Sequence, residues 1–376
     1  MSRHFLLGVA LALITAFSAH AQDGAARFRE AGKQEMAGHE TRLQFRRDGT
    51  FKILVISDLH YIPEPDLAAI SLTEDLIDLE KPDLVIVDGD NISGDRCNDL
   101  NDIKAAVANV AAAMERKKTP WAVVLGNHDQ DHFERTQVTK EQVFDLYESY
   151  PHNVNGGWVR DISGAGNKNL LLWSADSAKP LWNIWLLDSG GPHPEFRYEW
   201  IKPDQLAWYW YTSKTLEQTY GAKVPGLMFF HIPLPEFRDM VMSKKIIGER
   251  HEPESPSNVN SGLFSAVLDR KDIKAIFCGH DHVNNYLGWY RGVALGQVGV
   301  VGYHGYPHTP VADVTNDRAR GARVIVLDEK QPGQFTTWMR FRDRSVNWEA
   351  WSGAYTSAEL KQEMTGLPPS NPNGRD

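Results

Sequence analysis

The chain has 376 residues and is acidic, with 40 Lys and Arg against 49 Asp and Glu and a formal net charge of -9. An acidic chain without a run of basic residues is poorly suited to sequence-independent nucleic-acid binding, because such binding needs Lys and Arg to neutralise phosphates. The two cysteines, Cys97 and Cys278, are too few for a disulfide-stabilised scaffold. A bridge between them stays open, but we favour two buried thiols, since sequence cannot place their Cα atoms at bridging distance.

The first 21 residues have the pattern of a secretory signal peptide. Arg3 precedes an apolar run at residues 5–17, and the Ala19-His20-Ala21 site that follows suits signal peptidase. The run is too short to span a bilayer, although an uncleaved anchor is the alternative. Cleavage before Gln22 removes one basic and no acidic residue, so 39 basic residues face 49 acidic ones and the net charge becomes -10. We therefore expect a periplasmic or secreted protein without a stable membrane anchor.

Residues 22–376 could fill one large domain or two. No Pro/Ser-rich linker, internal repeat or low-complexity tract divides them. We predict one domain at residues 43–352, with a loose lead at 22–42 before it and a Pro/Asn/Gly-rich tail at 353–376 after it.

Five apolar runs in this domain each end at a polar cluster. The runs occupy residues 51–56, 84–87, 121–125, 227–230 and 273–277. Their continuous apolar character is typical of strands buried on both faces. Helical patterns at 66–79 and 102–116 separate the first three runs, which predicts parallel β-α-β units. Because ligands bind outside the carboxyl ends of such strands, we expect the polar clusters to converge on one rim.

The second half of the chain has a different pattern of apolar residues. It contains short apolar stretches at 169–173, 182–187, 293–301, 323–327 and 335–341, which predict a second, more mixed sheet packed on the first. Residues 203–216 form a predicted helix whose four aromatic residues we expect in the core. The predicted fold class is therefore α/β, with two sheets.

The first two polar clusters supply acidic and imidazole side chains. Asp58 and His60 are two residues apart, so they project from the same side of an extended segment, and Leu59 between them points inward. An Asp-x-His pair is common by chance. Asp90 follows Gly89, whose missing Cβ leaves the carboxylate free to lie against metal ions as a bridging ligand, although an acidic turn residue would satisfy the same pattern.

The later clusters are more specific. In Gly126-Asn127-His128-Asp129, the Asn127 amide oxygen can occupy a metal position while His128 stays free as an acid, with Asp129 orienting its ring. Gly279-His280-Asp281-His282 repeats the two-residue spacing, and His231 supplies one more imidazole. Seven side chains then suffice for two metal ions: Asp58, His60, Asp90, Asn127, His231, His280 and His282. This mixture of oxygen and nitrogen ligands favours Zn, Mn or Fe over Mg or Ca.

Three further residues are candidates for substrate contact. Asn91 follows the expected bridging carboxylate, and His304 lies between glycines after a predicted strand. Arg250 belongs to residues 237–260, which form either a lid beside the rim or an exposed loop.

The order Asp-x-His, Gly-Asp, Gly-Asn-His-Asp, His, Gly-His-x-His resembles the calcineurin-like metallophosphoesterase superfamily over residues 43–345. Further stretches at 187–190, 198–202, 231–235 and 260–262 are similar to a branch labelled probable inactive purple acid phosphatases, which includes a yeast protein phosphatase. The resemblance implies an α/β/β/α sandwich of four layers, with two mixed sheets face to face and helices outside. It departs from true purple acid phosphatases at Ser93, where those enzymes carry tyrosine, and at His60, where they carry glycine.

The resemblance also implies roles for the candidate residues. One metal ion would take Asp58, His60 and His282, the other Asn127, His231 and His280, and Asp90 would bridge them. Because every expected ligand type is present, we expect a phosphomonoesterase in which a metal-bridging hydroxide attacks a small phosphate ester or phosphorylated substrate and His128 protonates the leaving oxygen. The alternatives are a phosphodiesterase of the cyclic-nucleotide or glycerophosphodiester type and a catalytically silent metal- or phosphate-binding protein.

Overall fold

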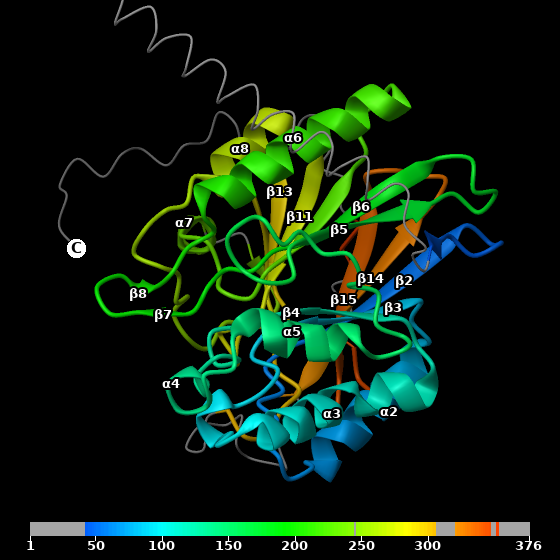
Figure 1. Ribbon diagram of the computed structural model, residues 1–376. Coiled ribbons are helices and arrows are strands. Elements are labelled where there is room, and N and C mark those ends of the chain that lie inside the picture. The colour runs from blue at the N-terminus through cyan, green and yellow to red at the C-terminus, as the bar shows by residue number, and fades with distance from the viewer. Residues whose placement is uncertain (1–41, 244–245, 306–319, 347–350, 353–376) are drawn as a thin grey trace, which may run out of the picture.

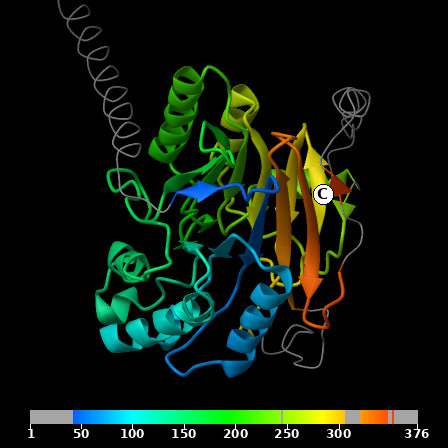
Figure 2. The same ribbon diagram turned by 90° about the vertical axis from the view of Figure 1, so that its right-hand side faces the viewer.

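The computed structural model describes residues 42–243, 246–305, 320–346 and 351–352. The expected signal peptide, all but residue 42 of the N-terminal lead, and the 353–376 tail lie outside these residues. Two β-sheets lie between two groups of helices, and Figures 1 and 2 show this arrangement from two directions. No helix in the described part of the chain is both long and apolar enough to cross a membrane.

The first sheet has six strands in the order β16-β15-β14-β2-β3-β4. One half of it, β2-β3-β4, is the predicted parallel unit, in which α2 and α3 connect neighbouring strands and β4 is the edge strand. The bounds are β2 Thr50–Ile56, α2 Leu67–Glu80, β3 Leu84–Asp88, η1 Gly94–Arg96, α3 Leu100–Lys117, β4 Trp121–Val124, α4 Phe133–Thr136, α5 Lys140–Glu148, β14 Gly321–Asp328, β15 Phe335–Phe341 and β16 Trp351–Ser352.

The second sheet has eight strands in the order β1-β5-β6-β9-β11-β13-β12-β10. A separate hairpin, β7 with β8, follows β6. The bounds are β1 Leu43–Gln44, β5 Lys168–Trp173, β6 Pro180–Leu186, β7 Pro192–His193, β8 Arg197–Tyr198, α6 Pro203–Tyr220, β9 Gly226–Phe229, α7 Glu236–Met242, β10 Ile246–Ile247, α8 Leu263–Arg270, β11 Ile273–Cys278, β12 Leu287–Tyr290 and β13 Val293–Gln297.

The placement of β14 and β15 corrects the sequence prediction, which put both strands in the second sheet. β14 instead pairs antiparallel along β2, from Arg323 opposite Val55 to Asp328 opposite Thr50, and β15 pairs with β14. These strands complete the hydrogen bonds on the side of β2 that faces away from β3. The first sheet is therefore mixed rather than parallel, because β14 runs antiparallel to β2 and β15 runs antiparallel to β14.

Three apolar layers hold the four structural layers together, and strand periodicity decides which layer each side chain enters. Along β2, Leu54 and Ile56 face α2, α3 and α5, whereas Ile53 and Val55 face the second sheet. Across the second sheet, Phe229 enters the layer between the sheets, and Met228 enters the layer beneath α6, α7 and α8. This arrangement confirms the α/β/β/α sandwich.

Three local features concern a helix cap, the aromatic residues of α6 and the two cysteines. Asp66 caps α2, its Oδ1 accepting from the backbone N of Ala68 and Ala69 at 3.0 Å. In α6, Trp208 and Tyr209 are buried, whereas Trp210 and Tyr211 are only partly covered. Both cysteines are buried free thiols, as favoured from the sequence.

Candidate metal centre

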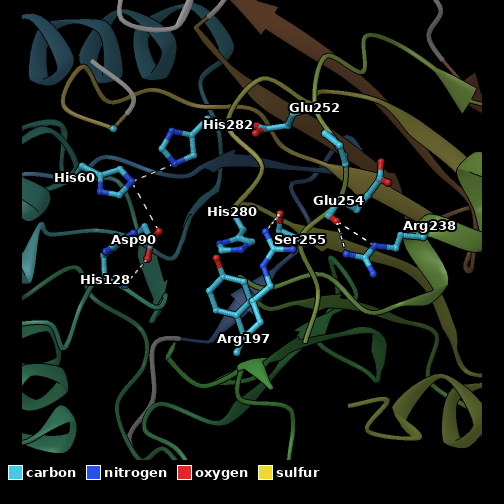
Figure 3. A pocket seen from close by; sticks show the side chains of 13 residues that line it. His60, Asp90, His128, Arg197, Arg238, Glu252, Glu254, Ser255, His280 and His282 are labelled. Atoms are coloured by element: carbon cyan, nitrogen blue, oxygen red, sulfur yellow. Dashed lines mark hydrogen bonds and ion pairs between the residues drawn. The ribbon is translucent and has the colours of Figure 1, made fainter. Parts of the chain in front are cut away.

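The five predicted strand ends meet at one edge of the sandwich. Figure 3 shows side chains from four of these ends: His60, Asp90, His128, and His280 with His282. Three of the five ends belong to the first sheet and two to the second, so the site lies where the carboxyl ends of β2, β3 and β4 face those of β9 and β11. The side chains delivered there by these ends are Asp58, His60, Asp90, Asn127, His231, His280 and His282. All seven are buried. Burial of so many ionisable groups in one place requires charge compensation.

Six of these side chains form two groups that share Asp90. The first contains Asp58, His60, Asp90 and His282, and the second contains Asp90, His231 and His280, with the ligand atoms in each group within 4.8 Å of one another. In the first group, His282 Nε2 lies 3.1 Å from Asp58 Oδ1. In the second, His231 Nε2 lies 3.0 Å from Asp90 Oδ2. Asp90 therefore lies between two sets of ligands.

Unusual backbone geometry places four of these residues. Asp58, His60, Asp90 and His280 have φ values of 56°, 49°, 48° and 75°, in the left-handed region that non-glycine residues seldom adopt. The expectation of an extended Asp58–His60 segment is therefore wrong. Left-handed turns instead bring the two side chains together, with His60 Nε2 4.0 Å from Asp58 Oδ1. Leu59 between them is buried, as predicted.

In three of these residues, Asp58, Asp90 and His231, hydrogen bonds hold one side-chain atom and leave another facing the centre. Asp58 Oδ2 accepts from Ser57 Oγ at 2.6 Å and from the His280 backbone N at 3.2 Å. Asp90 Oδ1 accepts from the His128 backbone N at 2.8 Å. His231 Nδ1 lies 2.8 Å from the Asp88 carbonyl oxygen, which fixes the ring with Nε2 towards Asp90.

Two buried ligand atoms that face the centre, Asn127 Oδ1 and His280 Nε2, have no hydrogen-bond partner among the described residues. Each carries a lone pair, and a buried lone pair without a donor is costly unless a cation takes it. The amide of Asn127 thus presents the oxygen that the sequence predicted as a ligand. The donor set fits two metal ions.

The electrostatics of the centre also favour bound cations. Burial would raise the pKa of Asp58, but the charges of His282 and His231 bring it down to about 2. Burial lowers the pKa of His60 and His280 to about 3, so both imidazoles are neutral and ready to bind a metal. Burial opposes protonation of His231 too, yet the charges of Asp90 and Asp58 raise its pKa to about 10. Metal binding would therefore displace a proton from His231.

His128 lies at the rim rather than among the ligands, with its side chain 46% exposed. Its Nδ1 lies 2.6 Å from Asp131 Oδ2. Burial lowers the pKa of His128, but the bond with Asp131 and the charge of Asp90 raise it to about 9. His128 is therefore a protonated side chain that faces the pocket beside the two ligand groups.

Asp129 does not orient His128, which corrects the sequence interpretation. The Asp129 carboxylate is buried and accepts from the backbone N of Asn91, Ile92 and Gly126 at 2.6 to 3.1 Å. It fixes the turns that carry Asp90 and Asn127, and Asp131 takes the predicted contact. Nothing in the spacing alone distinguishes the two carboxylates.

The three candidate substrate residues also lie elsewhere. Asn91 is buried, and its side-chain amide donates to the Val124 carbonyl and to Asp129. His304 Nε2 lies 3.5 Å from Asp66 Oδ2, outside the pocket lining. Arg250 is paired with Glu254 at 2.7 Å and does not line the pocket. Its own segment does contribute, since residues 252–255 form part of the wall.

Sequence reasoning missed two arginines that line this pocket. Arg197 lies in β8 and Arg238 in α7, on either side of residues 252–255 in Figure 3. Both are exposed. No sequence signal marks Arg197, and Arg238 lies only a few residues after His231, so the chain topology alone brings both arginines to the rim.

The fold and the strand-end ligands define a metallophosphoesterase. Residues 51–284 match the family model described as calcineurin-like phosphoesterase, which is well over half of the chain. The chain therefore belongs to the calcineurin-like phosphoesterase family, and the resemblance inferred from its motifs is confirmed.

Relatives support this assignment. "Probable inactive purple acid phosphatase 29" of Arabidopsis thaliana is 34% identical over 350 residues, which cover 81% of this chain and 86% of that protein. "Phosphatase DCR2" of Saccharomyces cerevisiae is 29% identical, over 65% of this chain but only 46% of its own length. A dimetal phosphatase from Danio rerio has a similar fold, with a TM-score of 0.50 and 16% identity over 81% of this chain and 99% of that structure.

A methyl group at Gly126 should disrupt the centre. A Cβ there would collide with the Asp90 backbone N and carboxylate, so we expect Gly126→Ala to displace Asp90 and to lower the metal content of the purified protein severalfold. Gly156→Ala is the matched control, because a Cβ at Gly156 meets only Glu148 Oε1 at 3.7 Å. Equal metal content in both variants, measured by elemental analysis, would contradict the role of Asp90.

Proposed function

We propose that the protein is an exported, metal-dependent phosphomonoesterase. The observation that carries the proposal is a full set of candidate ligands beside a protonated rim histidine. Six buried side chains form two groups that share Asp90, the buried Asn127 adds an amide oxygen, and His128 is held by Asp131. The plant relatives are named "inactive", but this chain lacks none of the expected ligand types, so its sequence gives no reason to expect inactivity. The phosphatase and dimetal-phosphatase names of other relatives favour a phosphate ester as substrate.

Each group of residues has a separate role in hydrolysis. Two metal ions, when bound, supply Lewis acidity and activate water for attack on phosphorus. Asp90 spaces the two ligand groups and compensates charge. His128, protonated and open to the pocket, donates its Nε2 proton to the oxygen of the departing alcohol. Asp131 accepts from Nδ1 and keeps the ring turned for that transfer.

Removal of either an acidic or an amide ligand should abolish turnover. We expect Asp90→Ala and Asn127→Ala to hydrolyse p-nitrophenyl phosphate at no more than about a thousandth of the wild-type rate, since charge stabilisation by both metals is lost. Asp75→Ala and Asn101→Ala, at exposed positions on α2 and α3, are the controls.

Comparison with bis(p-nitrophenyl) phosphate separates the rival functions. Faster turnover of the diester would favour a phosphodiesterase. A wild-type protein that binds metal but hydrolyses neither ester would favour a binding protein and reject the proposal.

Asp131 should control the pH range of activity. A protonated His128 is the active form, so activity declines as pH rises through its pKa. Loss of the Asp131 charge in Asp131→Asn lowers that pKa, and the alkaline limb of the kcat profile should move to lower pH, with kcat reduced about tenfold. Glu134→Gln, an exposed neighbour, should leave the profile unchanged. A profile in Asp131→Asn that superimposes on the wild type would exclude this role.

Export predicts a defined N-terminus. If the signal segment is removed at the Ala19-His20-Ala21 site, the protein recovered from the periplasm or medium should begin at Gln22. N-terminal sequencing tests this, and a recovered chain that retains residues 1–21 would show an uncleaved segment instead.

A further inference from the structure

The pocket extends well beyond the ligand cluster. Its volume is about 480 Å³, larger than a phosphoryl group needs. One end is formed by His60, Asp90, His128, His280, His282 and Gly305, and the rest by β8, the start of α7 and residues 252–255. The substrate's non-reacting part must therefore contact this second end, and the side chains there decide what that part is.

In the part of the chain that the structure describes, two guanidinium groups at this second end have no carboxylate partner. Arg197 Nη2 donates to Ser255 Oγ at 2.9 Å, and Arg238 donates through Nε and Nη2 to the Glu254 carbonyl oxygen at 3.1 and 2.9 Å. Among the described residues, no carboxylate oxygen lies within 4.0 Å of either group. The nearby Arg250 is different, because its bidentate pair with Glu254 neutralises it.

These contacts position the guanidinium groups without using up their charge. A neutral hydroxyl and a backbone carbonyl fix the two side chains, while further N–H groups remain for a ligand. The two acidic residues of this wall do not pair with Arg197 or Arg238. Glu254 is buried and binds Arg250 and Tyr286, and Glu252 accepts from the Val283 backbone N. In Figure 3, Glu252 lies beside His282, apart from both arginines.

Arg197 is next in sequence to a residue that contacts the metal centre. The ring of its neighbour Tyr198 packs edge-on against His280 with centroids 4.7 Å apart. Arg197 itself has a φ of 70°, a left-handed conformation that is costly for a non-glycine residue and is typical of functional sites. The β7–β8 hairpin thus carries a cation on the pocket wall next to a side chain that contacts His280.

We propose that Arg197 and Arg238 form a distal anion-binding subsite, and that the substrate is a small phosphate monoester carrying a second anionic group, either a carboxylate or another phosphate. Guanidinium groups bind both anions through paired N–H donors. This inference rests on the proposed phosphomonoesterase activity and adds a substrate class to it.

Three esters that share a benzene ring test the subsite: phenyl phosphate, 4-carboxyphenyl phosphate and 1,4-phenylene bisphosphate. The wild type should prefer at least one doubly anionic ester over phenyl phosphate in kcat/KM, and which one it prefers separates carboxylate from phosphate. Arg197→Gln and Arg238→Gln should each reduce that preference about tenfold, mainly through KM. Arg197→Lys, which keeps the charge, should restore part of it.

Arg116→Gln is the control, because Arg116 pairs with Glu74 on the surface of α3, away from the pocket. The subsite is rejected if both pocket variants keep the wild-type preference, or if the wild type has none. Calorimetry with the non-hydrolysable pair phenylphosphonate and 4-phosphonobenzoate provides a binding readout. If no ester is hydrolysed, the phosphatase proposal fails, but the binding measurement still tests the subsite. The wild type should then bind 4-phosphonobenzoate more tightly than phenylphosphonate, and Arg197→Gln should reduce that difference. Equal affinities in the wild type would reject the subsite.

Discussion

Two buried carboxylates lie beside each other at the end of the sandwich, and the rest of the site depends on compensating their charge. Asp58 and Asp90 are almost completely buried, and repulsion between like charges in a weakly polarisable interior is strong. Without metal, a protonated His231 between them supplies one positive charge. Cations of higher charge would compensate both carboxylates and use the unpartnered atoms of Asn127 and His280. The centre is therefore built for metal ions.

The fold makes this concentration of charge possible. Three apolar layers fix the two sheets face to face, so strand ends that are far apart in sequence meet at one edge. The left-handed turns at Asp58, His60, Asp90 and His280 then aim the side chains inward. Core packing offsets the strain of those turns, because the strands that lead into them are buried on both faces.

Much of this arrangement was predictable because it follows from local patterns. Buried strands end at polar clusters, and the carboxyl ends of parallel strands lie at one rim. This pattern was enough to predict that the seven candidate ligands lie at the same edge of the sandwich. Contacts set by irregular backbone were not predictable. Asp129 and Asp131 are two residues apart in the same turn, and only its three-dimensional path decides which one meets His128. Likewise, β14 joins β2 across more than 260 intervening residues, and the chain topology alone brings Arg197 and Arg238 to the pocket.

Diffraction at a metal absorption edge tests the central claim most directly, because it locates the ions independently of activity. Crystals of the protein isolated without added metal should show two anomalous peaks about 3.5 to 4 Å apart, one on each side of the Asp90 carboxylate. One peak should contact Asp58, His60 and His282, and the other Asn127, His231 and His280. A single peak, or peaks that do not share Asp90, would contradict the account.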